Sequence, residues 1–405
     1  MTTPQAARDR TTPALDVSFD DARAEAHRLG SGVPTGARPV TLAASLGATL
    51  ASPVTAPATI PPASVSAMDG WVVAGRGPWR LDGTVCMGSA PDGRLTAGTA
   101  RVVSTGAPVP AGTFAVLRSE HGYSDGVVVH ATVDVVPGAD VRPAGEELRA
   151  GDRVASAGSV VTPGIAAAAA VAGLDEVLVR STPRATLVQL GDEVVHAGVP
   201  APGQVRDAFA VPMSAALRML GVDVHRVVHV PDDPDATRDA LLDAVHDHCS
   251  DLVVSTGGTG HSGADHLVPA VTAARGRIVF RGVAVRPGHP TVLADVAGTP
   301  VLGLPGNPFA AFAALTTIGG ALVSGMLASA LPGGRLRIAA EELPGRGSCP
   351  RLIAARDTGS GLVATAQQGA GMASALAEAD VLALVPAPGI AAGAPVTAFP
   401  LAWPR

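Results

Sequence analysis

The segment from 183 to 330 alternates strand-like with helix-like runs, and this alternation constrains the fold more than any other feature of the sequence. Short apolar runs typical of buried strands are each followed by turn residues and a run with helical periodicity. Because parallel neighbours need crossover connections, the pattern predicts a doubly wound α/β domain over 183–330. The expected strands are 185–190, 224–230, 251–255 and 299–304, and the expected helices are 209–220, 234–248, 264–274 and 308–331.

The flanking segments predict smaller domains, which makes the chain a multidomain α/β protein. Short β-like runs between glycine turns predict an inserted antiparallel β subdomain over 51–140 and a C-terminal β-barrel-like domain over 331–405. Residues 15–50 and 141–182 together predict a small helical and linker subdomain. Its first helix begins at Ser18, a good capping residue, and has an apolar face.

Charge and composition exclude several classes of protein. The formal net charge is −6, and the chain has no lysine, so all 29 basic residues are arginine. The absence of a basic block argues against a nucleic-acid surface, and the apolar stretches are too short and too rich in alanine and glycine for a membrane span. The three cysteines are far apart, and the N-terminus lacks an apolar signal core, so we expect a cytoplasmic protein.

A glycine-rich turn follows the third expected strand of the α/β domain. Strand 251–255 leads directly into Thr256-Gly257-Gly258-Thr259-Gly260. Ligands of doubly wound sheets bind beyond the carboxyl ends of the strands, and paired glycines let backbone N–H groups approach an anion. The turn therefore predicts a phosphate site, and a tight strand-to-helix turn without a ligand is the alternative.

Three acidic residues border the same predicted edge. Glu193 follows strand 185–190, Asp232 follows strand 224–230, and Asp265 follows the glycine turn. Asp232, or its neighbour Asp233, and Asp265 could each simply cap a helix. Together the three carboxylates predict a site for Mg²⁺, which binds through carboxylates and neutralises phosphate charge.

Two further loops carry candidate ligand groups. The loop RPGHP offers Arg286, which could grip an oxyanion, and His289, which could donate a hydrogen bond or a proton. A stiff turn with solvated side chains is the alternative. The motif GLPGNP places Pro308 at a helix start and holds Asn307, the single asparagine of the chain, which could cap that helix or bind a ligand.

Three loops of the first half contain isolated polar residues. Asp69 lies in SAMDG, Thr105 in a proline-rich and glycine-rich loop, and Glu147 in GEEL. Considered separately, an Asp-Gly turn and solvated loop residues explain them. Their order along the chain is more specific.

Together and in this order, the segments resemble the MoeA family, the molybdopterin molybdenumtransferases related to the E domain of gephyrin. The matching motifs are SAMDGWVV at 66–73, STGAPVPAG at 104–112, GEEL at 145–148, GDEVV at 191–195, PGQVRD at 202–207, STGGTG at 255–260, RPGHP at 286–290 and GLPGNP at 303–308. This sequence departs from the usual family pattern in its glycine turn, in GEE for GED, in RDAF for RDSN and in RPGHP for KPGKP.

The resemblance implies a homodimer of four-subdomain subunits, with an α/β domain of the molybdopterin-binding type and a small C-terminal β barrel. It implies an enzyme that takes adenylylated molybdopterin, releases AMP and inserts molybdate with Mg²⁺ or another divalent cation. A molybdopterin adenylyltransferase would hand over the substrate. The alternatives are a non-catalytic binding or carrier paralogue and a different nucleotidyl transfer, which the GGTG turn suggests.

The resemblance also assigns residues, in a site between the α/β domain of one subunit and the β domain of its partner. Asp69, Thr105 and Glu147 would face molybdate and the dithiolene. Metal and phosphate would lie at Glu193, Asp232 and Asp265, and the loop cations would be Arg286 and His289. The pterin-phosphate pocket would be formed by Gly257, Gly258, Thr259, Gly260, Pro305, Asn307 and Pro308.

Overall fold

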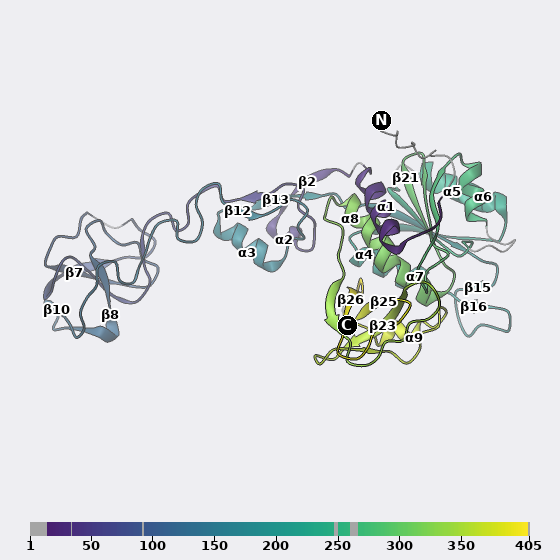
Figure 1. Ribbon diagram of the computed structural model, residues 1–405. Helices are drawn as coiled ribbons and strands as arrows, with labels where there is room; N and C mark the ends of the chain where they lie inside the picture. The colour runs from purple at the N-terminus through teal and green to yellow at the C-terminus, as the bar shows by residue number, and fades with distance from the viewer. Residues whose placement is uncertain (1–13, 34, 91–92, 247–249, 260–265, 404–405) are drawn as a thin grey trace, which may run out of the picture. The chain divides into compact units, whose positions relative to one another are not determined.

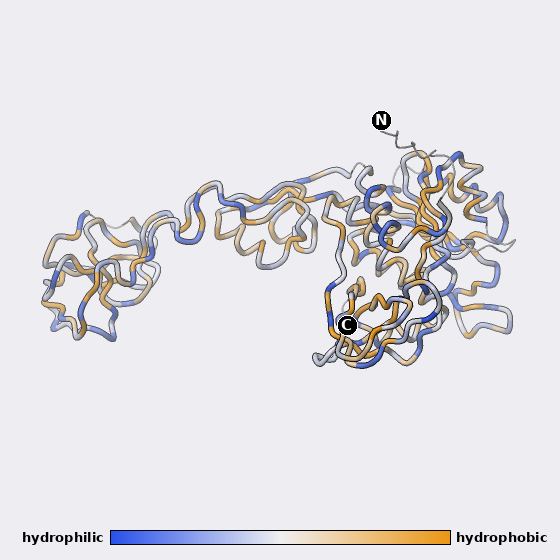
Figure 2. The backbone as a smooth tube through the Cα atoms, in the orientation of Figure 1, coloured by the Kyte–Doolittle hydropathy of each residue, from blue (hydrophilic) through white to orange (hydrophobic). Residues whose placement is uncertain are grey.

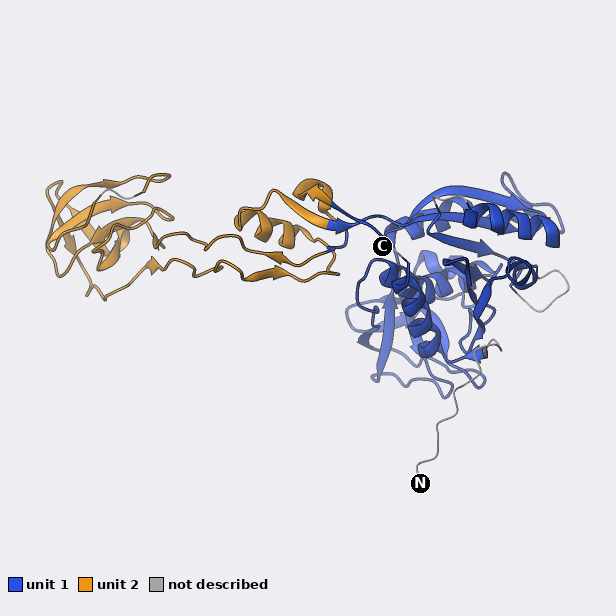
Figure 3. Cartoon of the chain, turned by 90° about the horizontal axis from the view of Figure 1, so that it is seen from above, with its two compact units in different colours: residues 1–38, 47–51, 179–405 blue, residues 39–46, 52–178 orange. Residues whose placement is uncertain are grey.

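The computed structural model describes residues 14–33, 35–90, 93–246, 250–259 and 266–403. The chain divides into two compact units (Figure 3). Unit 1 comprises residues 1–38, 47–51 and 179–405, and unit 2 comprises 39–46 and 52–178. Each unit is described by itself.

Unit 1 is built on a seven-stranded sheet with the order β1-β19-β20-β21-β18-β14-β17 (Figure 1). All four predicted strands of the α/β domain are confirmed, and they pair in parallel. The sheet as a whole is mixed, because β20 runs antiparallel to both neighbours and forms a hairpin with β19 that was not predicted. The strands are β1 (Ala14–Val17), β14 (Arg184–Leu190), β17 (Asp223–Val230), β18 (Leu252–Thr256), β19 (Arg277–Val283), β20 (Val292–Val296) and β21 (Thr299–Leu304).

Helices cover both faces of this sheet, since successive strand residues point to opposite sides. On β14, Leu187 faces one core and Val188 the other, and Leu302 and Val301 repeat this alternation on β21. The first core packs against α1, α4, α7 and α8, and the second against α5 and α6 (Figures 1 and 2). The helices are α1 (Phe19–Ser31), α4 (Ala210–Met219), α5 (Pro234–His246), α6 (Leu267–Ala273), α7 (Pro308–Ala314) and α8 (Gly320–Met326).

An apolar helical segment runs through the first core. Helix α7 continues through a π-helical turn, η2 (Leu315–Gly319), into α8, and it ends at Met326, earlier than predicted. Length and composition alone would let Pro308–Met326 cross a membrane, but 89% of its most apolar window is buried inside the protein. Its packing against the sheet accounts for that composition.

Helices α1 and α8 approach each other at two glycines. Ser18 caps α1 as predicted, because its hydroxyl accepts a hydrogen bond from the Asp21 amide at 3.1 Å. A Cβ added to Gly325 would collide with the carbonyl oxygen of His27, and one added to Gly30 would collide with that of Leu322. The two backbones are therefore closer than side chains would allow.

The C-terminal residues of unit 1 form a five-stranded antiparallel sheet with the order β22-β26-β25-β23-β24. One face has its own apolar core, and the other adds Leu352, Leu382 and Phe399 to the core around α7 and α8. The sheet therefore packs on the α/β part through shared apolar residues. Its strands are β22 (Arg335–Ile338), β23 (Arg351–Asp357), β24 (Leu362–Ala364), β25 (Val381–Val385) and β26 (Pro395–Pro400), and α9 (Ser374–Ala377) precedes β25.

Unit 2 contains a six-stranded sheet with the order β8-β5-β7-β6-β10-β9. The pairing is antiparallel as predicted except between β6 and β7, which run parallel. Short two-stranded ladders and the helices α2 (Leu42–Ser45) and α3 (Pro163–Val171) complete this unit. The sheet strands are β5 (Gly70–Val73), β6 (Trp79–Val85), β7 (Thr99–Val103), β8 (Ala115–Arg118), β9 (Gly122–Ser124) and β10 (Val128–Ala131).

We predict that Gly325→Ala lowers the free energy of unfolding of the protein by about 1–3 kcal/mol, because a methyl group must separate α8 from the α1 backbone. Denaturant unfolding measures the effect. Gly320→Ala is the matched control in the same helix, where the added Cβ lies 3.8 Å from Leu220 and only helix propensity improves. Equal midpoints for the two variants would contradict the close crossing.

Candidate functional site

A cleft of about 670 Å³ opens at the carboxyl edge of the parallel strands of unit 1. Loops that follow β14, β17, β18 and β21 form its walls, which is where ligands of such sheets bind. A short ladder, β15 (Val194–Val195) with β16 (Val205–Arg206), adds a further wall. All described members of the predicted metal and pterin-phosphate set line the cleft, namely Glu193, Asp232, Gly257, Gly258, Thr259, Pro305, Asn307 and Pro308.

The glycine turn has the backbone that glycine permits. Gly257 and Gly258 have φ values of +84° and +62°, and a Cβ at Gly257 would lie 2.9 Å from the carbonyl oxygen of Leu190. The Gly257 amide donates to the Leu304 carbonyl at 3.1 Å, so the expectation that both glycine amides turn toward an anion is wrong for Gly257. Gly260 lies outside the described residues.

Asn307 faces two pockets and leaves its helix without a side-chain cap. Pro308 occupies the first turn of α7 as predicted, but the side chain of Asn307 makes no capping hydrogen bond to the residues that the structure describes. Asn307 is exposed and lines both the cleft and a second pocket. Of the two predicted roles, ligand binding is therefore the one its position favours.

Two carboxylates of the predicted metal set lie at the rim. Helix α5 is capped by Asp233, whose carboxylate accepts the Ala236 amide at 2.7 Å, so Asp232 is not needed as a cap. Instead, the Asp192 amide donates to the Asp232 carboxylate at 3.5 Å, and the Asp232 amide donates to the Asp192 carboxylate at 3.4 Å. Glu193 and Asp232 both line the cleft, and Asp265 lies outside the described residues.

Asp207 is the most firmly held carboxylate of the cleft. Its Oδ1 accepts the Gln189 side-chain amide at 2.7 Å and the backbone amides of Phe209 and Ala210 at 2.7 and 3.1 Å. Burial alone would raise the pKa of Asp207, but these donors outweigh it and hold the pKa below its usual range. Asp207 therefore carries a fixed negative charge and anchors the start of α4.

A second pocket of about 520 Å³ adjoins the cleft and shares Pro290, Pro305 and Asn307 with it. Its charged lining groups are cationic, or can become so, namely Arg286, His289, Arg346 and Arg351. Partial burial and then the positive charge of Arg346 hold the pKa of Arg351 below its usual range. Such a concentration of positive charge is typical of a site for an oxyanion.

Backbone hydrogen bonds tie the RPGHP loop to the C-terminal sheet. The Arg286 amide donates to the Pro350 carbonyl at 3.0 Å, and the Leu352 amide donates to the Arg286 carbonyl at 2.8 Å. Arg286 and Arg351 are thereby paired as in a parallel bridge. The backbone of the loop is therefore fixed, but Arg286 is exposed, so the alternative of a stiff turn with solvated side chains stays open.

Asp69 and Thr105 lie together in unit 2. The Thr105 amide donates to Oδ1 of Asp69 at 2.7 Å, and its hydroxyl does so at 3.2 Å. Gly70 follows with φ +149°, and any Cβ there would collide with the Leu117 carbonyl. The close backbone approach therefore requires glycine at position 70, and the exposed Asp69 directly precedes β5.

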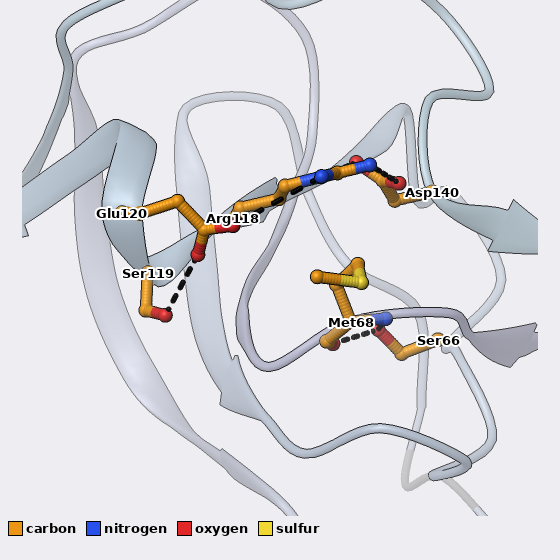
Figure 4. A network of polar contacts seen from close by, with 6 residues as sticks. All are labelled: Ser66, Met68, Arg118, Ser119, Glu120 and Asp140. Atoms are coloured by element: carbon orange, nitrogen blue, oxygen red, sulfur yellow. Dashed lines mark hydrogen bonds and ion pairs between the residues drawn. The ribbon is translucent and has the colours of Figure 1, made fainter.

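A polar network holds the loop that carries Asp69 (Figure 4). The Ser66 hydroxyl donates to the Met68 carbonyl at 2.6 Å. The Arg118 guanidinium donates two hydrogen bonds to the Asp140 carboxylate, at 2.7 and 2.8 Å. The Arg118 hydrogen bond holds the pKa of Asp140 below its usual range despite partial burial. The Asp140 carbonyl in turn accepts the Ala67 amide at 2.8 Å, which links the ion pair to the loop.

Glu147 lies apart from this network. Its amide donates to the Ile60 carbonyl at 3.1 Å, its side chain is exposed, and Gly145 supplies the left-handed residue of its turn with φ +73°. No contact recorded among the described residues joins it to Asp69 or Thr105.

Several lining residues had no role assigned from sequence. Asp207 lies within the PGQVRD motif, so the motif marks it, although its type and spacing suggest no chemistry. Arg346 and Arg351 reach the second pocket from a distant part of the chain. Only tertiary packing could reveal them.

Two family models match the chain. The MoeA N-terminal region (domain I and II) matches residues 17–173, and a probable molybdopterin binding domain matches residues 186–323. Molybdopterin molybdenumtransferase 2 of Mycobacterium tuberculosis is 33% identical over 272 residues, which are 62% of this chain and 66% of that protein. The molybdopterin molybdenumtransferase of Synechococcus elongatus is 32% identical over 267 residues, 62% of this chain and 65% of that protein. The matches thus span just under two thirds of these relatives.

Solved structures show the same fold over nearly the whole chain. Two crystal structures of molybdopterin biosynthesis MoeA proteins from Pyrococcus horikoshii give TM-scores of 0.77 and 0.81, with 22% and 19% sequence identity. They cover 96% and 95% of this chain and 100% of their own chains. The likeness establishes the multidomain α/β fold.

We predict that Asp207→Asn lowers the free energy of unfolding at neutral pH by about 1–2 kcal/mol. Because the folded-state pKa of Asp207 is depressed, its ionic contribution is present above about pH 4 and is lost as the pH falls through the folded-state pKa. Unfolding measured from neutral to acid pH should bring the variant and the wild type together. Asp243→Asn, on an exposed face of α5, is the control, and a pH-independent difference would contradict the assignment.

Proposed function

The chain belongs to the MoeA family, and on that premise we propose that it is a molybdopterin molybdenumtransferase of molybdenum cofactor biosynthesis. Such an enzyme takes adenylylated molybdopterin, releases AMP and inserts molybdate. The observation that carries the proposal is the pair of adjoining pockets in unit 1, one rimmed by carboxylates and the other lined by cations. A substrate with a phosphate-bearing pterin and an oxyanion co-substrate needs both environments.

The cleft is the proposed pterin-phosphate site. Thr259, Pro305 and Pro308 give it rigid walls, and Asn307, whose side chain caps no helix among the described residues, offers an amide at the junction with the second pocket. Gly257 and Gly258 keep side chains away from the floor, which lets a phosphate approach the backbone. The chain contributes positioning here rather than a covalent intermediate.

The cationic pocket is the proposed molybdate site. Arg286 and Arg351 can each donate two parallel hydrogen bonds to an oxyanion, and Arg346 adds a third positive charge. Partial burial and then repulsion from Arg346 lower the pKa of Arg351, and a bound dianion would offset the repulsion. Molybdate would then lie next to the cleft, at the junction that Pro290, Pro305 and Asn307 line in both pockets.

Glu193 and Asp232 fit a divalent cation such as Mg²⁺, since Mg²⁺ is commonly held by one or two carboxylates, water and substrate phosphates. No group of three or more acidic, histidine or cysteine ligands exists among the described residues, and the proposed third ligand Asp265 lies outside them. When bound, the cation would neutralise phosphate charge. Glu193 and Asp232 would orient it at the cleft rim.

The remaining assignments are proposed on the family resemblance. Asp69, Thr105 and Glu147 would act on the molybdate and dithiolene side, and the two hydrogen bonds from Thr105 support a fixed Asp69 carboxylate. We also propose a cytoplasmic homodimer of four-subdomain subunits, divided as 15–50 with 141–182, 51–140, 183–330 and 331–405. It would receive its substrate from a molybdopterin adenylyltransferase, without nucleic acid or membrane.

A non-catalytic carrier is the second candidate, because the RPGHP loop replaces one cation of KPGKP by a histidine. The relatives named as transferases do not favour it. A carrier would bind adenylylated molybdopterin without turnover, so the activity assay separates the two candidates.

We predict that the purified protein with Mg²⁺ and molybdate releases AMP from adenylylated molybdopterin. Tight substrate binding without AMP release would overturn the transferase proposal and leave the carrier.

Asp69→Ala should reduce molybdate insertion by about two orders of magnitude or more while the protein stays folded. Asp69→Asn retains the acceptor for Thr105 and tests whether charge is needed, and Asp134→Ala is an exposed control in the same unit.

We predict that Arg351→Gln raises the molybdate concentration for half-maximal insertion about tenfold or more, because a charged hydrogen-bond donor is lost. Molybdate titration at saturating pterin substrate measures it. Arg356→Gln, exposed on the same strand β23 but outside the pocket, should behave as the wild type. Equal effects of the two substitutions would place the oxyanion elsewhere.

A further inference from the structure

The second pocket contains one ionisable group whose charge can change near neutral pH. The chain has no lysine, and arginine stays protonated in proteins, so histidine is the only other side chain that can supply a cation. His289 is that residue among the groups lining the pocket. What His289 can offer a ligand depends on which of its ring nitrogens is already engaged.

An N-terminal residue engages one of these nitrogens. Nε2 of His289 lies 2.8 Å from Oδ1 of Asp16, which belongs to β1. The same carboxylate oxygen would lie 2.5 Å from a Cβ at position 282, where Gly282 has φ +98°. Asp16 itself has φ +57°, a conformation that aspartate tolerates better than most residues. The local backbone is shaped so that this carboxylate reaches the loop.

Strand β19 is the common frame for the pair. On one side β1 pairs with β19 in parallel, with Val17 opposite Val283. On the other side the Val283 amide donates to the His289 carbonyl at 2.9 Å, and the Gly282 amide donates to the Thr291 carbonyl at 3.0 Å. Both partners are therefore fixed by backbone hydrogen bonds to adjacent residues of one strand.

The contact with Asp16 determines whether the other ring nitrogen of His289, Nδ1, can donate or accept a hydrogen bond. A carboxylate only accepts hydrogen bonds, so Nε2 carries the proton that is shared with Asp16. Nδ1 of a neutral imidazole is then an acceptor and repels an oxyanion, whereas Nδ1 of an imidazolium donates to it. His289 can therefore join the arginines in binding an anion only in its protonated form.

We propose that Asp16 is a positioning residue that directs His289 to bind oxyanion as an imidazolium, which makes oxyanion binding in this pocket pH-dependent. The inference rests on the oxyanion role proposed above for the pocket. The charged groups that contact His289 or line its pocket are Asp16 from β1, Arg286 from its own loop, and Arg346 and Arg351 from the C-terminal residues. The three arginines oppose the imidazolium, and Asp16 and a bound dianion favour it.

Calorimetric titration of the whole protein with molybdate alone, and in parallel with sulfate, tests the proposal between about pH 6 and about pH 9. The wild-type affinity should fall in one step as the pH rises. His289→Gln should remove the step and leave the weaker affinity at all pH values. Asp16→Asn should make the step about two- to fivefold smaller, because neutral His289 would no longer be held with its proton on Nε2 and could donate from Nδ1.

Two further variants separate positioning from folding effects. Asp16→Glu should restore the wild-type profile in large part, and Asp20→Asn, an exposed carboxylate in the first turn of α1, should leave it unchanged. A step that persists in His289→Gln, or an Asp16→Asn profile that superimposes on the wild type, would overturn the inference.

Imidazole NMR without ligand distinguishes this outcome from failure of the proposed function. With its ring signals assigned from the His289→Gln variant, neutral His289 should carry its proton on Nε2 in the wild type and lose that preference in Asp16→Asn. That difference supports the pair even if the protein releases no AMP. An unchanged His289 tautomer alongside normal AMP release would overturn the pair and leave the transferase proposal intact.

Discussion

Burial of the helical segment Pro308–Met326 in one apolar core fixes the parts of unit 1 that line the two pockets. The core contains residues of the central sheet, of α1 and of the C-terminal sheet, so all three parts pack against the same segment. Its N-terminal end, where Asn307 lies, is held at the junction of the two pockets. This arrangement is rigid, because a close-packed protein interior has low compressibility.

The two pockets differ in how they acquire their groups. The cleft follows from topology, since any parallel arrangement of β14, β17, β18 and β21 brings their following loops to one edge. The cationic pocket requires the C-terminal sheet to pack on the α/β part, because Arg346 and Arg351 come from beyond α8. Loss of that packing would take Arg346 and Arg351 away from the second pocket and leave it with Arg286 and His289.

The sequence predicted the cleft better than its details. The parallel strands and the acidic rim follow from hydrophobic periodicity and turn residues, and both are local patterns. Whether Asp232 or Asp233 caps α5 depends on the backbone conformation of a single residue, which periodicity does not resolve. The β19–β20 hairpin was missed because its strands flank the RPGHP loop without a helical crossover, so the alternation that identified the other strands is interrupted there. Arg351 lies beside Arg286 because the two residues form a parallel backbone bridge between distant parts of the chain, and residue spacing along the sequence does not indicate such a bridge.

The N-terminal strand β1 carries Asp16, so the residue at which a recombinant fragment begins decides whether His289 keeps this partner. β1 is an edge strand with a single neighbour, β19, and α1 begins two residues after its last residue. A recombinant fragment that began at Ser18 would keep six strands of the sheet and the residues that line the cleft. It would lack Asp16 and with it the 2.8 Å contact to Nε2 of His289. On the proposed role of Asp16, fragments that differ by a few N-terminal residues would therefore differ in how they bind anions.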